Sequence, residues 1–226
     1  LGHTGLFVSE LCMGTWGFSG RNYFGGAIGT LSQSDATKFI GRALEARINF
    51  IDTANVYSYG DSELMTGQAL KDLGVKRSDV VLATKVFGRM AGGPNDMGAS
   101  RGHIMDSVSL SLERLQTDHI DLYQIHHSDP VTPLEETMAA LDWIVRSGRA
   151  LYAGISNYNG EPWGKNLNVD FEERLRDGKI GFVVVHAANN AFGGWKEYNQ
   201  MIGMGWRGNG GGDRLFLDAD GKEVKV

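Results

Sequence analysis

The sequence predicts an α/β protein built around a parallel β-sheet. Strand-like and helix-like segments alternate up to residue 157, and capping residues or glycines separate them. Five strands alternating with four helices imply right-handed βαβ units, whose strands run in parallel. A barrel and an open doubly wound sheet both fit this pattern, so the choice depends on where the polar residues fall.

The first strand is predicted within residues 6–16 (LFVSELCMGTW), which end in small residues. Ser32 or Ser34 can cap the helix that follows. The apolar residues of that helix repeat with helical spacing at Ala36, Phe39, Ile40, Ala43 and Leu44.

The second and third units follow the same order. Residues 48–54 (INFIDTA) predict a strand, and residues 62–74 predict a helix that a glycine ends. Residues 79–86 (DVVLATKV) form a continuous apolar run, which is typical of a strand covered on both faces. The next helix is predicted over about 101–116, with its apolar stripe at Ile104, Val108, Leu112 and Leu115.

Residues 119–127 (HIDLYQIHH) predict the fourth strand and residues 150–157 (ALYAGISN) the fifth. Between them, Thr132 is expected to cap a helix with Pro133 in its first turn, and Gly148 to end it. The buried stripe of that helix is predicted at Leu134, Met138, Leu141 and Val145.

The composition limits the classes of function. The chain has 226 residues, of which 42% are apolar and 22% charged, and its formal net charge is -5. No basic run points to a nucleic-acid partner, and no apolar stretch approaches the roughly 20 residues of a membrane span. The single cysteine, Cys12, excludes an intrachain disulfide and fits a cytoplasmic protein.

Polar residues stand where the predicted strands end. Asp52, Lys85 and His126 close the second, third and fourth strands, and Ser156 with Asn157 closes the fifth. The carboxyl ends of parallel strands lie on one rim, which carries the active site in barrels. Burying such groups near one another is costly unless they pair, so their recurrence at equivalent positions favours a functional site.

Tyr57 follows Asp52 in a loop that can lean over this rim. A neighbouring ammonium favours phenolate, so Lys85 is expected to lower the pKa of Tyr57 from its ordinary value near about 10. The hydroxyl would then protonate a carbonyl oxygen, with Asp52 holding Lys85 charged. His126 would donate a hydrogen bond to the same carbonyl and orient it.

Other residues of reactive types are interpreted as structural. Cys12 lies in an apolar run and is expected to be a small buried core residue. His127 neighbours His126 and is expected to face the opposite way on its strand. His186 ends a later apolar run without a cysteine or paired carboxylate, and the glycine-rich 207–214 (RGNGGGDR) is interpreted as a loop.

Three motifs in order make residues 1 to about 159 resemble the aldo-keto reductase family. They are INFIDTANVYSYGDSE at residues 48–63, LERLQTDHIDLYQIHH at 112–127 and SGRALYAGISNY at 147–158. The resemblance is greatest to the branch of bacterial and potassium-channel β-subunit-like proteins. It implies a (β/α)8 TIM-type barrel and hydride transfer between NADP(H) and a small aldehyde or ketone.

The resemblance also implies roles for single residues. Tyr57 would be the general acid, and Lys85 and Asp52 would adjust its pKa. His126 would be the residue that orients the carbonyl. The strand-end pair Ser156–Asn157 would bind the nicotinamide carboxamide. The glutamine, the stacking aromatic and the basic phosphate loop that the family places on its later strands are not found after this pair.

Residues 158–226 are more similar to the ThuA-like (trehalose utilization) family, a flavodoxin-like fold. NYNGEPW, the strand-like IGFVVVHAANNAF and the motif EYNQMIG carry this resemblance. The sequence therefore predicts a chimera: residues 1–157 form an aldo-keto reductase-like partial barrel with the first five βα units, and residues 158–226 continue it as a partial flavodoxin-like βα segment.

An unclosed barrel would leave parallel strand edges exposed, so we expect a homo-oligomer that covers them. The main functional hypothesis is an NADP-dependent reductase acting on a small carbonyl substrate. Two alternatives stay open: a non-catalytic regulatory module or inactive chimera, because part of the cofactor site is missing, and a carbohydrate-related ThuA-like module. In the last case, the site would be lined by Trp163, Trp195 and Trp206.

Overall fold

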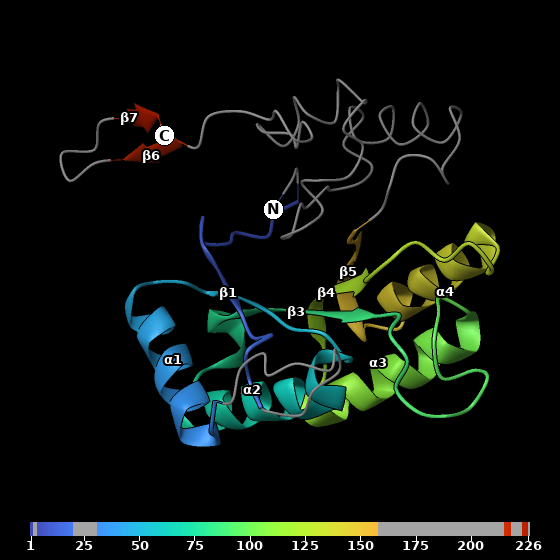
Figure 1. Ribbon diagram of the computed structural model, residues 1–226, viewed down its shortest axis with the longest axis horizontal. Coiled ribbons are helices and arrows are strands. Elements are labelled where there is room, and N and C mark those ends of the chain that lie inside the picture. The colour runs from blue at the N-terminus through green and yellow to red at the C-terminus, as the bar shows by residue number, and fades with distance from the viewer. Residues whose placement is uncertain (2–3, 20–30, 158–214, 218–222, 226) are drawn as a thin grey trace.

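The computed structural model describes residues 1, 4–19, 31–157, 215–217 and 223–225 (Figure 1). The predicted ThuA-like segment lies almost entirely outside these residues, and its flavodoxin-like fold stays a prediction. At the C-terminal end, two short strands, β6 (Leu215–Leu217) and β7 (Glu223–Lys225), form an antiparallel pair.

Five parallel strands form the main sheet, and they pair in the order in which they occur along the chain. They are β1 (Cys12–Gly14), β2 (Phe50–Asp52), β3 (Val81–Val86), β4 (Ile120–Ile125) and β5 (Ala150–Ile155). In a doubly wound sheet the strand order reverses at a switch point. The sequential order has no such point, so it is the order found at the start of a (β/α)8 barrel.

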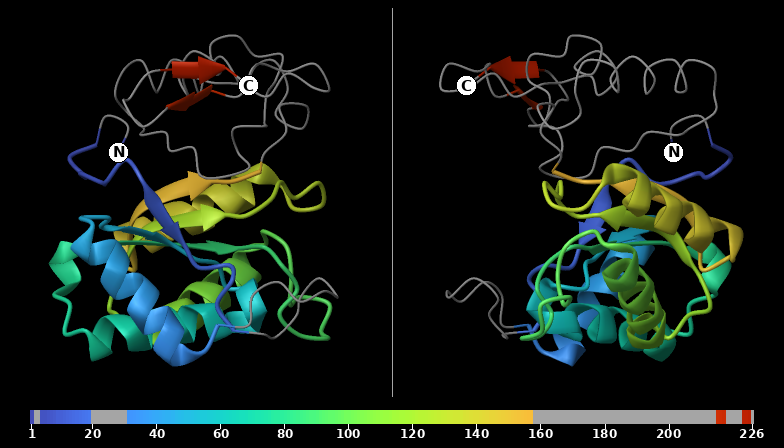
Figure 2. Two further views of the ribbon diagram at one scale, coloured as in Figure 1. Left: turned by 60° about the vertical axis from the view of Figure 1, so that its left-hand side comes forward. Right: turned by 90° about the vertical axis from the view of Figure 1, so that its right-hand side faces the viewer.

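Four helices cover one side of this sheet (Figures 1 and 2). They are α1 (Gln33–Glu45), α2 (Asp61–Asp72), α3 (Arg101–Leu115) and α4 (Leu134–Arg146), with short 3-10 turns at Tyr57–Gly60 and Arg77–Asp79. Right-handed crossovers between sequential strands place every helix on the same face. The opposite face, which we call the inner face, is therefore free to carry the site.

Local capping explains where the helices begin. Of the two serines considered for α1, Ser32 is the N-cap, and its Oγ accepts a hydrogen bond from the Asp35 amide at 3.2 Å. The prediction for α4 is wrong by one residue, because Pro133 occupies the N-cap position. The Thr132 hydroxyl donates instead to Asp129 Oδ2 at 2.8 Å, which draws it away from the helix end.

The buried face of α4 also differs from the prediction. Met138 is 49% exposed and Val145 36% exposed, and the side chains that are buried are Thr137, Ala140, Leu141 and Ile144. The Thr137 hydroxyl donates to the Ala99 carbonyl at 2.8 Å. This bond ties α4 to the segment just before α3, so a polar contact as well as the apolar pattern accompanies the burial of this face.

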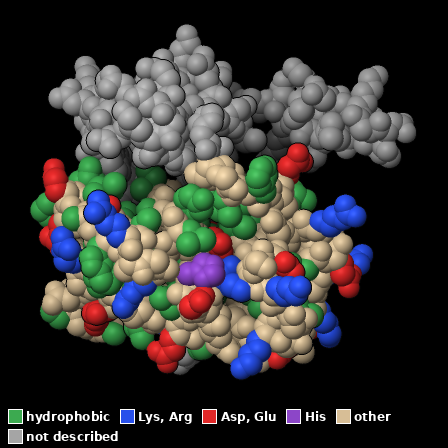
Figure 3. All heavy atoms as spheres, turned by 180° about the vertical axis from the view of Figure 1, so that it is seen from behind, with side chains coloured by type: hydrophobic (Ala, Val, Ile, Leu, Met, Phe, Trp, Pro, Cys, Tyr) green, Lys and Arg blue, Asp and Glu red, His purple; other side chains and the backbone are tan. Residues whose placement is uncertain are grey.

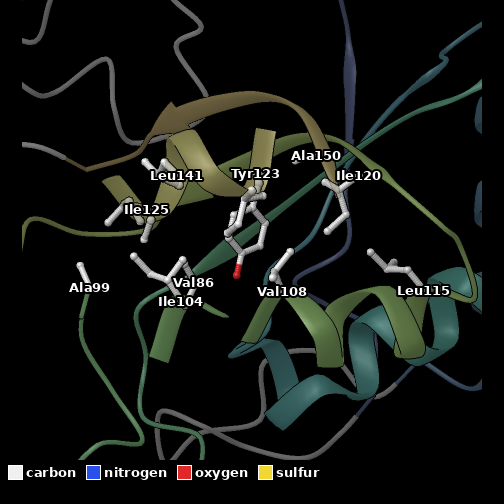
Figure 4. Packing of buried hydrophobic residues seen from close by; sticks show 12 residues of the cluster. Val86, Ala99, Ile104, Val108, Leu115, Ile120, Tyr123, Ile125, Leu141 and Ala150 are labelled. Atoms are coloured by element: carbon white, nitrogen blue, oxygen red, sulfur yellow. The ribbon is translucent and has the colours of Figure 1, made fainter. Parts of the chain in front are cut away.

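Tyr123 lies at the centre of the larger apolar cluster between the sheet and its helices (Figure 4). It is completely buried and projects from β4 toward α3, where Ile104 and Val108 flank it. The predicted stripe of α3 is confirmed by this packing. Such contacts fix the position of β4 relative to α3. This position matters because β4 ends beside the predicted site.

The inner face is apolar at its lower end. Phe50, Val81, Ala83 and Leu122 form a cluster there, and Leu1, Leu6, Val8 and Tyr152 pack against it. Cys12 is exposed, so its prediction as a buried core residue is wrong. Met13 takes the place in the helix-side cluster, and strand alternation turns Cys12 to the inner face.

The described surface is mixed in charge. Acidic and basic side chains are interspersed on the face seen in Figure 3. Helical ion pairs also occur, such as Lys38 with Asp35 and Arg42 with Glu45 in α1. None of the helices in the described ranges has the length and apolarity needed to cross a membrane.

The close approach of α2 and α3 can be tested at Gly67. A Cβ atom there would lie 2.6 Å from the backbone oxygen of Leu115, whereas a Cβ at Gly102 of α3 would meet open space. We expect Gly67→Ala to lower the free energy of unfolding by about 1–3 kcal/mol. Gly102→Ala should raise it by about 0.5–1 kcal/mol through helix propensity. Denaturant unfolding of both variants measures this, and equal effects would contradict the packing described.

Candidate active site

The predicted site residues converge on the inner face at the carboxyl ends of the strands. Along β3, Leu82 packs among the helix-side residues, and alternation turns Lys85 to the inner face. Lys85 pairs in register with Gln124 of β4, two residues before His126. Asp52 is the last residue of β2. Three neighbouring strands thus deliver an acid, a base and an imidazole to one rim.

Lys85 is the centre of the site. Only 2% of its side chain is exposed, and its ammonium donates to Asp52 Oδ2 at 2.5 Å, to the Thr53 carbonyl at 2.8 Å and to the Tyr57 hydroxyl at 3.4 Å. Burial acts to lower the pKa of Lys85, but the Asp52 carboxylate and Tyr57 outweigh it, so the pKa is raised above its ordinary value. Lys85 is therefore charged although it is buried.

A strained turn presents Tyr57. It begins the 3-10 turn Tyr57–Gly60, in which Ser58 and Tyr59 have φ angles of 51° and 55°. Such left-handed non-glycine residues cost about 1–3 kcal/mol each, and they persist where the surroundings determine them. Here the Ser58 hydroxyl is within 3.0 Å of the Phe18 carbonyl and donates to it. The loop is thus held, not free.

The pKa of Tyr57 is raised, contrary to the expectation from the sequence. Burial raises it most, the Lys85 charge opposes this, and the Asp52 carboxylate raises it further. The expectation failed because it left out the burial of the phenol, which outweighs the effect of Lys85 on the pKa, with Asp52 adding to the increase. Tyr57 is consequently a neutral phenol at ordinary pH, which is the form that gives a proton.

His126 lies immediately after β4, and its amide donates to the Val86 carbonyl at 2.9 Å. Its ring meets the Tyr57 ring edge-on, with centroids 5.6 Å apart. The expectation that His127 faces the opposite way is wrong, because the two imidazoles stack at 4.9 Å. The strand ends at Ile125, so the strict alternation of a strand does not extend to these residues.

Ser156 and Asn157 follow β5 directly and are tied to the end of β4. The Ser156 amide donates to the Ile125 carbonyl at 2.8 Å. Asn157 has a φ of 52°, and its Nδ2 donates to the His126 carbonyl at 3.1 Å and to Ser156 Oγ at 3.0 Å. The structure thus places this pair beside His126, as the strand-end argument predicted.

Two residues of the site were missed by the sequence argument. Gln124 Nε2 donates to Asp52 Oδ1 at 3.3 Å, so both carboxylate oxygens are engaged. The Trp16 ring lies 6.2 Å from that of Tyr57 and walls the site beyond β1. Gln124 could have been found as a buried-strand polar residue two positions before His126; Trp16 has no comparable signal.

A cavity elsewhere on the protein is a weaker candidate for the active site than this rim. One of about 670 Å3 opens near the amino ends of β2 and β3, beside Leu44, Arg47 and Val75. Active sites of barrels lie at the opposite, carboxyl end. Among the described residues, no three His, Cys, Asp or Glu side chains gather as metal ligands would.

Comparison with known proteins decides the family. A family model described as the Aldo/keto reductase family matches residues 10–205. The chain belongs to the aldo/keto reductase family. This match runs well past residue 157, the boundary predicted from the sequence, so the similarity to aldo/keto reductases is not confined to the described strands β1–β5 and helices α1–α4.

Relatives of known sequence and structure agree with this assignment. The chain is 40% identical over 206 residues to a probable voltage-gated potassium channel subunit beta of Oryza sativa subsp. japonica, covering 89% of this chain and 58% of that protein. It is 42% identical over 168 residues to the uncharacterized oxidoreductase YrpG of Bacillus subtilis, covering 71% and 49%. It also matches the solved holo form of aldo-keto reductase AKR11C1 from Bacillus halodurans, with a TM-score of 0.66, 31% identity, and coverage of 90% and 62%.

The chain therefore spans about half to three fifths of the length of these aldo/keto reductase relatives. The described part contains the first five strands and first four helices of the family's barrel, with Asp52, Tyr57, Lys85 and His126 brought together as predicted.

The buried pair of Asp52 and Lys85 predicts a strong energetic coupling. Asp52→Asn leaves the ammonium buried without a counter-ion, and we expect it to lower the free energy of unfolding by about 3–5 kcal/mol. The double variant Asp52→Asn/Lys85→Met removes both charges and should recover much of that loss. A double-mutant cycle by denaturant unfolding measures the coupling, and additive effects would contradict the pairing.

The raised pKa of Tyr57 can be measured directly. The tyrosinate absorbance that is lost in Tyr57→Phe should titrate with a midpoint above the ordinary value of about 10, because burial favours the neutral phenol. Circular dichroism across the same pH range checks that the fold persists. A midpoint below that value would show that Lys85 dominates after all.

Proposed function

We propose that this chain carries the active site of a carbonyl reductase that uses a nicotinamide cofactor and acts on a small aldehyde or ketone. The observation that supports this best is the buried Lys85 ammonium, held between the Asp52 carboxylate and the Tyr57 hydroxyl. This arrangement keeps the Tyr57 hydroxyl, a proton donor, beside the fixed positive charge of Lys85. Among relatives, the versiconal hemiacetal acetate reductase of Aspergillus parasiticus, 38% identical over 174 residues, is a named reductase.

The donor set at the end of β5 fits the carboxamide of a nicotinamide. An amide ligand needs one donor and one acceptor, and Ser156 with Asn157 offers both. The Ser156 hydroxyl accepts from Asn157 and so retains its own proton to donate. Asn157 uses its Nδ2 on the protein, which leaves Oδ1 as an acceptor. We propose NADP(H) as the cofactor from the family resemblance, and the solved relative in its holo form supports a bound cofactor.

The residues of the chain then divide the work of carbonyl reduction. The chemistry that a reduced nicotinamide would supply, when bound, is a hydride for the carbonyl carbon. Tyr57 donates its phenolic proton to the carbonyl oxygen, which completes the alcohol. The Lys85 ammonium stabilises the phenolate that remains, and Asp52 keeps Lys85 charged and oriented. His126, edge-on to Tyr57, orients the carbonyl by a hydrogen bond.

Cofactor binding is the first test. We expect NADPH to quench the tryptophan fluorescence of the purified chain with a saturable curve, and Ser156→Ala/Asn157→Ala to weaken it. Trp143→Phe is the control for the fluorescence signal, because it shows how much of the quenching comes from the tryptophan of α4. If no binding is seen for NADPH or NADH, the reductase proposal fails and the non-catalytic module becomes the better account.

Proton donation is the second test. Tyr57→Phe keeps the ring but removes the proton, and we expect it to lower kcat for carbonyl reduction by about 100-fold to 10,000-fold. Tyr59→Phe, a neighbouring and exposed tyrosine, is the control. Unchanged turnover in Tyr57→Phe would contradict the assigned role.

The partner and location predicted from the sequence remain proposals. A second copy of the chain would cover the outer edges of β1 and β5, each of which pairs with one strand within the described residues. Light scattering would show a dimer or larger assembly if this holds, and a monomer would contradict it. A cytoplasmic location is proposed on the cysteine content alone. The carbohydrate-related alternative rests on residues outside the described ranges and gains no support.

A further inference from the structure

A second buried ion pair lies directly behind the site, on the helix side of the sheet. Glu63, in the first turn of α2, is fully buried, and each of its carboxylate oxygens accepts a hydrogen bond. Oε1 accepts from the Thr84 hydroxyl at 2.5 Å, and Oε2 accepts from Arg114 Nε at 2.6 Å. The carboxylate therefore joins three elements, β3, α2 and α3, at a single point.

One of these bonds fixes the strand that carries the lysine. Thr84 precedes Lys85 in β3, and alternation places the two side chains on opposite faces. The bond from Thr84 to Glu63 thus anchors β3 from the helix side, while Lys85 reaches Asp52 and Tyr57 on the inner face. A shift of the Glu63 carboxylate would be transmitted to the backbone of Lys85 across one peptide unit.

The other bond fixes the turn that carries the tyrosine. Gly60 ends the strained turn with a φ of 96°, and the Arg114 side chain lies against it. A Cβ at Gly60 would stand 2.8 Å from Arg114 Cδ and 2.9 Å from its Nε. Arg114 is held in this place by its bond to Glu63. The Arg114 side chain therefore packs against the last residue of the turn, Gly60, three residues after Tyr57.

We propose that Glu63 and Arg114 are positioning residues, which set the separation of the Tyr57 hydroxyl and the Lys85 ammonium by holding β3 and the Tyr57 turn to one carboxylate. The inference deepens the proposed function and rests on it for its kinetic consequence. Misplacing a catalytic group by about 1 Å can reduce turnover on the order of 100-fold, so a remote brace of this kind is chemically relevant.

The chain offers a matched control for a merely structural role. Arg77 and Asp121 form another largely buried ion pair, and this pair also bridges to β3, because the Leu82 amide donates to Asp121 Oδ2 at 2.8 Å. Arg77 also donates to the Thr117 hydroxyl and to the carbonyls of Val80 and His119, at the amino ends of the strands. It is therefore remote from the Tyr57 turn.

The experiment compares Arg114→Ala with Arg77→Ala, and uses Arg114→Lys to test rescue by a conservative change. Three quantities are measured: the unfolding midpoint, the ionisation of Tyr57 against the same variant carrying Tyr57→Phe, and kcat and KM for carbonyl reduction. Both alanine variants should lower the unfolding midpoint. Only Arg114→Ala should lower kcat, by on the order of 10-fold to 100-fold with a smaller change in KM.

The ionisation of Tyr57 gives a reading that does not depend on catalysis. Burial is the main cause of its raised pKa, so a loosened turn should move that pKa down toward its ordinary value in Arg114→Ala. Arg77→Ala should leave it unchanged, and Arg114→Lys should restore it in part. If Arg114→Ala does not fold, Glu63→Gln keeps the volume and one acceptor oxygen, and it is interpreted in the same way.

Two negative results can be told apart. A destabilised Arg114→Ala with unchanged Tyr57 ionisation and unchanged kcat would overturn the inference and leave a structural ion pair. Absence of any carbonyl reduction by the parent chain would instead overturn the proposed function. In that case, the Tyr57 titration still decides whether Arg114 positions the turn.

Discussion

The Lys85 ammonium is almost fully removed from water, so neighbouring oxygens must offset the free energy lost with its hydration. Most residues of this site serve that purpose. Desolvation of one charge costs several kcal/mol, so the lysine can stay charged only with oxygens arranged around it. Asp52, the Thr53 carbonyl and the Tyr57 hydroxyl supply them. Each comes from β2 or the loop after it, so the β2–β3 pairing is what makes the charge tolerable.

The same interaction gives the site its chemical character. A lone lysine beside a tyrosine would favour phenolate, but burial favours the neutral phenol and the Asp52 carboxylate adds to this effect. The site therefore holds a proton donor next to a positive charge that is already present. Little reorganisation is needed when negative charge appears on the phenol oxygen, which is the condition for electrostatic stabilisation of a developing anion.

Contacts on two sides stabilise the strained conformation of the Tyr57 turn. Ser58 is bonded to the backbone after β1, and Arg114 packs beneath Gly60 from α3. The left-handed residues Ser58 and Tyr59 belong to a run that no local propensity would favour. Tertiary contacts therefore determine the conformation of the residue that is proposed to do the chemistry.

Predictions of packing failed where helical periodicity allowed more than one buried face. The apolar stripe predicted for α4 placed Met138 and Val145 inside, but the helix buries Thr137, Ala140 and Ile144 beside Leu141. Periodicity measures which residues are apolar, and it does not measure how closely two elements can approach. The stacked His126 and His127 show a similar limit, because strand alternation stops where the strand does.

By itself, the sequence determined the order of strands and helices, the convergence of Asp52, Lys85 and His126 at one rim, and the family. The order and the convergence follow from local periodicity and from the rule that parallel strands share their carboxyl ends, whereas the family follows from the resemblance of three motifs. Only the tertiary structure decided the sequential strand order, the direction of the Tyr57 pKa and the brace formed by Glu63 and Arg114. The reason is physical: a pKa and a brace depend on summed burial and charge from segments far apart in the chain, which no local pattern records.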